Sequence, residues 1–502
     1  MSRLTPSFLP PLALDAGSET PLYRQIEMWF RRAILAGRLK PGQRVPSTRV
    51  LARELQVSRV PVVSAYELLI EEGYLQTFIG AGTCVARGNP GAALRRGMAA
   101  QAQSAVTKPQ EVKRSVSRRA MEMNGRARAW LQRVRGGSNL EHFPLAIWSQ
   151  LIGRHARKIS RDNTGYGNAM GYEPFREAVA EYLGAFRAVR CDASQIMVTT
   201  GGQQALQIAA LALLDPKDSA WLEEPSYPGT QQALKLAGAR LVPVPVDAQG
   251  LSVECGIAKA EQARAAFVTP SHQFPLGVSM SATRRRELLD WACRRGAWII
   301  EDDYDSEFRF SGKPSAALQG FDPCGRVIYA GTLTHAMFPA LRLGFMVIPR
   351  DLIRSFIDIR GAADTLATSM LHQMAMTDFI REGHFSRYIR RMRDVYGENR
   401  NLLVAPIRAQ LAGDLEVVGN EAGMHLATLL PPGANDVQLA ANLPRMSVTV
   451  YPLSECYLRP PKRGGLMIGY ANLDVNEIPA ILHALKSGIR EATQALPARL
   501  RA

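Results

Sequence analysis

The sequence of 502 residues predicts an α/β protein in three parts: a small helical domain that ends in a hairpin, a large domain on a mostly parallel sheet, and a smaller C-terminal α+β subdomain. Three observations lead to this prediction. Short amphipathic helices precede a glycine turn within the first 90 residues, apolar strands alternate with helices from residue 140 onward, and the last segment of about 110 residues mixes helices with short strands.

The composition is that of a folded globular chain, with 46% hydrophobic and 21% charged residues, which excludes disorder over the whole length. The formal net charge of +16 is unevenly distributed. Residues 1–90 carry +4, residues 91–136 carry +9 and the remaining 366 residues carry +3. A positive field confined to the first quarter of the chain predicts a polyanionic partner there, and nucleic acid fits best.

The cysteines and the hydropathy of the sequence predict the cellular compartment in which the protein resides. The six cysteines lie far apart without a C-x-x-C pair, so we expect reduced thiols and neither a disulfide framework nor a zinc site. Residues 1–11 do not resemble a signal peptide, and the longest apolar stretches, such as 208–214, are too short to span a bilayer. We therefore expect a cytoplasmic protein with no bound metal and no membrane contact. The cysteines are Cys84, Cys191, Cys255, Cys293, Cys324 and Cys456.

The first 90 residues predict a winged helix-turn-helix, because three short helices precede two short strands around a glycine turn. Ser47 is expected to cap the second helix and Ser58 the third. The predicted helices cover residues 23–35, 48–55 and 59–70, and the predicted strands 74–78 and 83–85 flank the turn at 80–82.

In such a domain the third helix enters the major groove of double-stranded DNA. We expect its side chains to contact bases and the start of the second helix and the wing to contact phosphates. The alternative is a small interaction domain with solvated arginines, and the charge asymmetry favours DNA. The predicted DNA-binding residues are Arg49, Ser58, Arg59, Ser64, Tyr66, Gly80 and Gly82.

Residues 88–137 are rich in Ala, Gln, Ser and Arg and lack periodicity, which predicts a flexible basic linker. Beyond the linker, strands are expected at 195–200, 219–222, 240–246, 265–269, 297–301 and 327–329, separated by helices such as 203–214 and 282–295. The expected domains are therefore 15–87 (winged helix), 88–137 (linker), 138–390 (large domain) and 391–502 (small subdomain).

Several N-terminal segments together resemble the GntR-type winged helix. They are Pro-Leu-Tyr-Arg-Gln-Ile at 21–26, the run from Gly37 to Arg49, Val-Ser-Arg at 57–59, Ala-Tyr at 65–66 and Glu-Gly-Tyr-Leu at 72–75. One departure is Pro61, where that family usually has Thr. Proline fits the first turn of a helix but offers phosphate neither an N–H nor a hydroxyl, so we expect altered operator contacts.

The large domain resembles the fold-type I aminotransferases. The resemblance lies in Glu-Glu-Pro-Ser-Tyr-Pro at 223–228, Thr-Pro-Ser-His-Gln-Phe-Pro at 269–275, the run 300–308 and Phe-Pro-Ala-Leu-Arg-Leu-Gly at 338–344. Joined to a GntR-type head, the chain resembles the MocR family, which pairs a DNA-binding domain with a domain that senses pyridoxal 5′-phosphate (PLP). The resemblance covers about nine-tenths of the chain and implies PLP as cofactor, a homodimer and a small-molecule effector of the amino-acid or PLP type.

The resemblance also implies roles for individual residues. Asp302 would pair with the pyridine nitrogen, Tyr304 would hydrogen-bond the phenolic oxygen and Tyr227 would stack on the ring. Arg342 would clamp the phosphate, and Tyr166 would reach the phosphate in the partner subunit's site. The full set of implied cofactor-binding residues is Tyr166, Gly201, Gly202, Gln203, Tyr227, Asp302, Tyr304, Thr334 and Arg342.

His335 is the most consequential departure. The aminotransferase pattern is Gly-Thr-Phe-Ser-Lys, whereas residues 331–335 read Gly-Thr-Leu-Thr-His, so histidine stands at the Schiff-base lysine position. Imidazole is not a primary amine and cannot bond covalently to the cofactor aldehyde. We therefore expect no catalytic residue, and His335 either fills the pocket as a neutral side chain or transfers protons. Gly202 for Ser and Leu276 for Thr are further departures.

Three states of the pocket follow: no PLP, PLP or an adduct held without a covalent bond, or an active enzyme. The first hypothesis is a DNA-binding transcriptional regulator whose aminotransferase-like domain dimerises and senses an effector. The alternative is a PLP-dependent aminotransferase with an accessory DNA-binding domain. A third possibility is a regulator that uses the large domain for dimerisation alone. Arg459 is a candidate for a substrate carboxylate.

Overall fold

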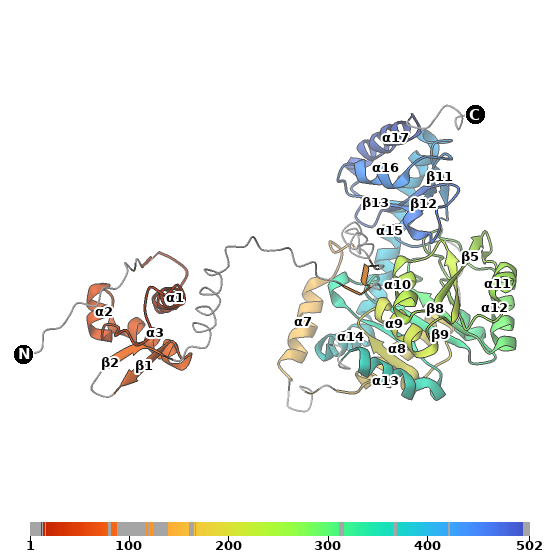
Figure 1. The fold of residues 1–502 in the computed structure, drawn as a ribbon. Coiled ribbons are helices and arrows are strands. Elements are labelled where there is room, and N and C mark those ends of the chain that lie inside the picture. The colour runs from red at the N-terminus through yellow and green to blue at the C-terminus, as the bar shows by residue number, and fades with distance from the viewer. Residues whose placement is uncertain are drawn as a thin grey trace, which may run out of the picture. The chain divides into compact units, whose positions relative to one another are not determined.

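The computed structural model of the chain has two compact units, residues 1–115 and 116–502 (Figure 1). It describes residues 17–78, 82–87, 139–159, 167–310, 316–364, 369–419 and 422–494, together with residues 12, 14, 15, 116, 117, 120, 121, 123 and 165. Most of the predicted linker 88–137 lies outside the described residues.

The first unit contains the predicted three helices and two strands: α1 (Leu22–Leu35), α2 (Thr48–Glu54), α3 (Arg59–Glu71), β1 (Leu75–Phe78) and β2 (Gly82–Val85). β1 and β2 form an antiparallel hairpin in which Leu75 faces Val85. As predicted, Ser47 caps α2, because its hydroxyl accepts the Val50 N–H at 3.3 Å. Ser58 precedes α3 but makes no such side-chain bond, so the predicted cap is wrong in that detail.

The core of the first unit follows the helical periodicity of the sequence. Ile26, Phe30, Val62 and Leu69 are fully buried, on faces of α1 and α3 that pack against each other. Burial of these apolar faces stabilises helices that are too short to persist alone.

The second unit contains an eight-stranded sheet in the order β3-β10-β9-β8-β7-β4-β5-β6. Strands β4, β5, β7, β8 and β9 are parallel, whereas β10 and β6 run antiparallel to their neighbours, so the sheet is mostly parallel, as predicted. The bounds are β3 (Ile196–Thr199), β4 (Ser219–Glu224), β5 (Arg240–Asp247), β6 (Gly250–Leu251), β7 (Ala265–Val268), β8 (Trp298–Asp303), β9 (Val327–Thr332) and β10 (Gly344–Val347).

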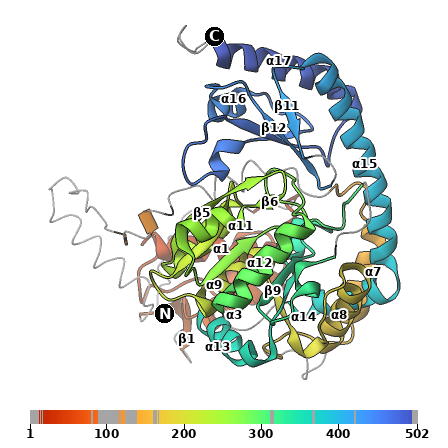
Figure 2. The same cartoon turned by 90° about the vertical axis from the view of Figure 1, so that its right-hand side faces the viewer.

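Helices cover both faces of this sheet. Ile300 on β8 packs in the cluster that contains α9 and α10, whereas its neighbour Ile299 packs on the other face with α12 (Figure 2). This two-sided burial explains why the strands are nearly continuous apolar runs in sequence. The helices are α7 (Leu145–Ala156), α8 (Glu173–Arg187), α9 (Gly202–Leu213), α10 (Pro228–Ala237), α11 (Val253–Ala260), α12 (Ala282–Arg295), α13 (Ile353–Ala363) and α14 (Met370–Arg381).

The small subdomain has a four-stranded antiparallel sheet in the order β11-β12-β14-β13. The long helix α15 (His384–Gln410) reaches it from the large domain, so the predicted boundary at 390/391 falls inside this helix (Figure 2). The other elements are β11 (Glu416–Val418), β12 (His425–Leu429), β13 (Thr449–Pro452), β14 (Gly465–Gly469), α16 (Asp436–Asn442) and α17 (Ile478–Gln494).

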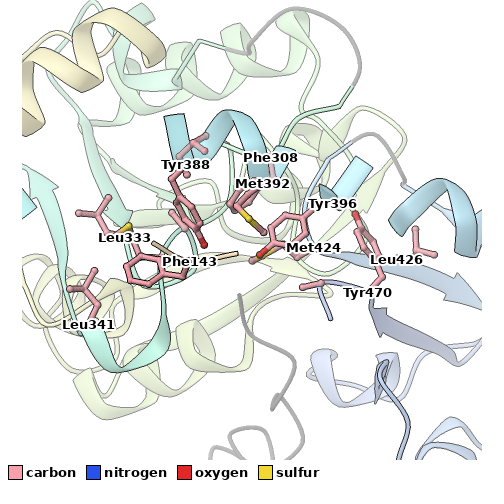
Figure 3. Packing of buried hydrophobic residues seen from close by; sticks show 14 of the residues in the cluster. Phe143, Phe308, Leu333, Leu341, Tyr388, Met392, Tyr396, Met424, Leu426 and Tyr470 are labelled. Carbon is pink, nitrogen blue, oxygen red and sulfur yellow. The ribbon is translucent and has the colours of Figure 1, made fainter. Parts of the chain in front are cut away.

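One continuous core connects the two parts of the second unit. Tyr388 and Met392 of α15 lie in the same buried cluster as Phe143, and Tyr396 packs edge-to-face on Phe308 at 4.9 Å. The cluster continues into the small subdomain through Leu426 and further residues of its sheet (Figure 3).

The structure corrects the prediction for the cysteines. Cys293 at the end of α12 and Cys324 in the loop before β9 form a disulfide, with their Cα atoms 5.8 Å apart. The two cysteines are 31 positions apart in sequence, and the chain between them folds back so that they meet, which sequence spacing does not reveal. The other four cysteines are free thiols. None of the helices among the described residues is long and apolar enough to cross a membrane.

Candidate functional site

Three of the predicted DNA-binding residues lie at the starts of α2 and α3. Arg49, Ser58 and Arg59 are exposed, and the Arg59 Nε donates to the Thr48 hydroxyl at 3.1 Å, which places the two helix starts side by side. Ser64 is half-buried. In the wing, Gly82 is exposed with a φ of +83°, while Gly80 lies outside the described residues.

Tyr66 is the exception, and its predicted contact with DNA is wrong. Its side chain is 3% exposed, and its hydroxyl donates to the Pro46 carbonyl at 2.9 Å. Its ring also packs edge-to-face on Phe30 at 5.4 Å. The physical reason is helical periodicity, since position 66 falls on the inner face of α3 with Val62 and Leu69.

Val60 is a surface residue that the sequence interpretation missed. It lies in the first turn of α3, between Arg59 and Pro61, and its side chain is 72% exposed. An apolar side chain on a groove-reading helix can contact the methyl group of thymine. The available signal was its position directly after the Ser-Arg pair at the helix start.

The second unit contains a cavity of about 170 Å³ at the carboxyl ends of the parallel strands. Ligands of open α/β sheets bind at this edge. The small subdomain supplies the opposite wall through β12, β13 and β14. Tyr166 lies outside the described residues, and the other eight predicted cofactor-binding residues all line the cavity: Gly201, Gly202, Gln203, Tyr227, Asp302, Tyr304, Thr334 and Arg342.

One end of the cavity forms a cradle for a small anion. α9 begins at Gly202, and its first N–H groups lack partners within the helix. A Cβ at Gly201 would lie 3.6 Å from the Thr334 hydroxyl and 3.7 Å from the Arg342 Nη1, so the three residues surround one point. The Thr334 hydroxyl oxygen is buried and has no hydrogen-bond partner among the described residues. This donor set fits the phosphate of PLP.

Asp302 lies at the end of β8 and lines the cavity. Burial, together with the neighbouring carboxyls of Asp303, Glu223 and Asp305, raises the pKa of Asp302 to about 7. A protonated pyridine nitrogen would supply the positive charge that this carboxylate needs. Tyr227, which would flank the ring, packs edge-to-face on Phe274 at 5.5 Å.

A hydrogen-bonded group of residues that the sequence interpretation missed lies behind Tyr304. The Tyr304 hydroxyl is 2.9 Å from the His272 Nδ1, which is also 2.9 Å from the Asp305 carboxylate. Burial lowers the pKa of His335, and it lowers that of His425 to about 4, so both imidazoles are neutral at neutral pH. The Thr-Pro-Ser-His-Gln-Phe-Pro motif contained His272, but only tertiary structure brings it to Tyr304.

The residues that line the cavity bear on two expectations, that no lysine anchors a cofactor there and that Arg459 binds a substrate carboxylate. None of the described residues that line it is a lysine, and His335 is among them. Arg459 does not line it; its side chain is exposed, and its backbone N–H donates to the Glu224 carboxylate at 3.1 Å. The structure therefore does not support Arg459 as the partner of a carboxylate in this cavity.

Comparisons with known proteins agree with both units. The family described as "Bacterial regulatory proteins, gntR family" matches residues 22–85, and "Aminotransferase class I and II" matches residues 139–485. The probable rhizopine catabolism regulatory protein MocR of Rhizobium meliloti is 39% identical over 493 residues, covering 97% of this chain and 98% of that protein.

Two further similarities extend this result. The uncharacterized HTH-type transcriptional regulator YhdI of Bacillus subtilis is 33% identical over 477 residues, covering 94% of this chain and 97% of that protein. The crystal structure of kynurenine aminotransferase from Pyrococcus horikoshii superposes with a TM-score of 0.69 at 25% identity, covering 77% of this chain and 99% of that chain.

The fold, the site and these similarities define a DNA-binding transcriptional regulator with a GntR-type head and an aminotransferase-like domain of fold type I, a fold family that binds PLP. The chain belongs to the MocR family.

Proposed function

We propose that the protein is a homodimeric transcriptional regulator that senses a small molecule in the cavity and holds PLP there without a covalent bond. The observation that carries this proposal is the composition of the cavity. It contains eight residues suited to PLP and no lysine among its described lining, and His335 lies in it at the position that the resemblance to aminotransferases gives to the anchoring lysine. The combination favours a binding site over an aminotransferase active site.

Different residues of this chain would bind the phosphate and the ring of PLP. The N-terminus of α9, Thr334 and Arg342 hold the phosphate, and Asp302 pairs with the ring nitrogen. When bound, PLP supplies an electron-withdrawing ring and an aldehyde that reacts with primary amines. Neutral His335 can accept or donate a proton at its ring nitrogens but cannot form the bond that lysine forms.

The DNA-binding head would place α3 in the major groove of an operator, with Arg59 and Val60 at base edges and Arg49 at a phosphate. Ligand binding in the cavity favours one arrangement of the large and small subdomains over others. In a dimer such a shift changes how the two heads are presented to their half-sites, and therefore the affinity for the operator.

The first experiment tests the state of the cofactor. The full chain is titrated with PLP by calorimetry, then treated with borohydride and passed through gel filtration in denaturant. We expect saturable binding with no cofactor retained by the wild type, and retained cofactor in a His335→Lys variant. Cofactor retained by the wild type would mean that another lysine anchors it, which would restore the aminotransferase alternative.

The second experiment tests regulation. Fluorescence anisotropy is recorded with a DNA duplex selected by the full chain from a random pool, with and without PLP and amine or amino-acid ligands, and sedimentation gives the oligomeric state. We expect a dimer whose operator affinity changes on ligand binding. Unchanged affinity with every ligand that binds would favour a domain that serves for dimerisation alone.

A further inference from the structure

The two ends of the cavity differ in chemistry. Arg342 lies at the phosphate cradle, whereas an apolar part of the lining is formed by Phe274, Tyr451, Met424 and Met467, which we call the apolar wall. Three of these, Phe274, Tyr451 and Met467, pack together in one buried cluster. A ligand whose phosphate occupies the cradle extends its substituent toward this wall.

Met467 lines the cavity because of strand alternation in β14. Leu466 and Ile468 point into the main core, while Met467 between them belongs to the cluster beside the cavity. Its side chain is 7% exposed and lines the cavity. A thioether at this position offers packing to an apolar group and no positive charge.

The described lining offers no cation for a second anionic group. Arg342 is its single arginine or lysine, while Asp302 and Asp305 both line the same cavity. Burial keeps His335 and His425 neutral. Arg459 and Arg463 of the small subdomain are not among the lining residues; Arg459 is exposed, and Arg463 pairs with Glu416 at 2.6 Å.

A carboxylate against this wall would lose its hydration without gaining an ion pair. An α-amino acid held through its amino group at PLP carries such a carboxylate, whereas a simple amine does not. We propose that the effector of this cavity is a primary amine without an α-carboxylate, bound together with PLP, rather than an α-amino acid. This proposal rests on the proposed sensing function and narrows the class of its ligand.

The test compares two stable probes that differ by one carboxylate. They are N-(5′-phosphopyridoxyl)-3-methylbutylamine and N-(5′-phosphopyridoxyl)-L-leucine, each titrated into the full chain by calorimetry. We expect the amine probe to bind at least about tenfold more tightly. Equal binding, or tighter binding of the leucine probe, overturns this inference and leaves the sensing function intact. Failure of both probes and of PLP to bind overturns the sensing function itself.

A variant pair tests the role of the apolar wall. Met467→Arg introduces a guanidinium beside the substituent, and we expect the preference for the amine probe to disappear or reverse. Met467→Leu is the matched control and should keep the wild-type preference. A preference that persists in a folded Met467→Arg protein contradicts the assignment to this wall. If Met467→Arg does not fold, the comparison of the two probes on the wild type decides alone.

Discussion

Four carboxyl groups lie close together at the cavity, those of Glu223, Asp302, Asp303 and Asp305. Asp303 pairs with Arg187 at 2.7 Å, and Asp305 lies beside His272. Glu223 instead accepts hydrogen bonds from the N–H and hydroxyl of Thr269, and burial raises its pKa from 4.5 to about 7. A carboxyl group whose pKa differs between the folded and unfolded states makes the free energy of unfolding depend on pH.

Glu223→Gln should change that dependence in a defined direction. The pKa of Glu223 is higher in the folded state, so its contribution to stability is fully present below about pH 4.5 and is lost as pH rises through about 7. Between pH 5 and 8 the wild type should therefore lose about 2 kcal/mol relative to the variant. Denaturant unfolding at both pH values measures this, and a difference that is constant with pH would show that Glu223 stays ionised.

Tyr66→Phe distinguishes a core residue from a DNA contact. Loss of the buried hydrogen bond to the Pro46 carbonyl should destabilise the head by about 1–2 kcal/mol. Operator affinity of the folded protein should not change. Thermal unfolding and anisotropy measure the two quantities, and Tyr23→Phe, at a half-buried tyrosine of α1, is the control. Weaker DNA binding with unchanged stability would restore Tyr66 as a contact.

At the scale of elements, the helices and strands for which the sequence patterns gave bounds agree with the structure to within a few residues. α12 and the capped α2 agree because their boundaries depend on local signals, Ser281 and Ser47 at the N-caps. β10 and β6 were missed because they are short, and their antiparallel pairing to β9 and β5 depends on the whole sheet. His272 beside Tyr304 was missed for the same reason, since tertiary structure alone joins them.

The start of α10 contains a glycine that the cavity requires. A Cβ at Gly229 would lie 2.0 Å from the Gln203 Oε1 and 2.2 Å from the Tyr227 ring. Gly229→Ala should therefore displace Tyr227 and weaken PLP binding at least about tenfold. Calorimetry measures the affinity. Gly184→Ala in α8, where a Cβ meets no atom within 4 Å, is the control, and equal affinities of the two variants would refute the packing argument.

At the scale of the whole molecule, sequence alone indicated two tasks for one chain. The charge distribution assigned nucleic-acid binding to the first quarter of the chain and a different task to the rest. The motifs of the second part resemble those of aminotransferases, and this resemblance indicated which residues meet in one cavity. The apolar wall was not predicted, because Met424, Tyr451 and Met467 have no individual signature and come together only when the small subdomain packs over the sheet edge. The pairing of Cys293 with Cys324 was hidden for a similar reason.

Operator binding by the full chain should depend strongly on salt, because the positive charge is concentrated near the head. We expect affinity to fall at least about tenfold between 50 and 200 mM KCl. Arg49→Ala should weaken binding on all sequences and reduce the salt slope by about 1. Arg354→Ala, at an exposed residue of α13 paired with Asp358, is the matched control. An unchanged slope for Arg49→Ala would exclude its phosphate contact.

α15 belongs to both halves of the effector unit. It has 27 residues and is therefore about 40 Å long, with Phe385 packed in the large domain at one end and Ile407 near β11 at the other. Because α15 is this long, a tilt of the helix by a few degrees about one end moves its other end by a few ångströms. If a ligand in the cavity shifts the small subdomain, we therefore expect α15 to carry that shift to the large domain, without the chemistry that a lysine would provide.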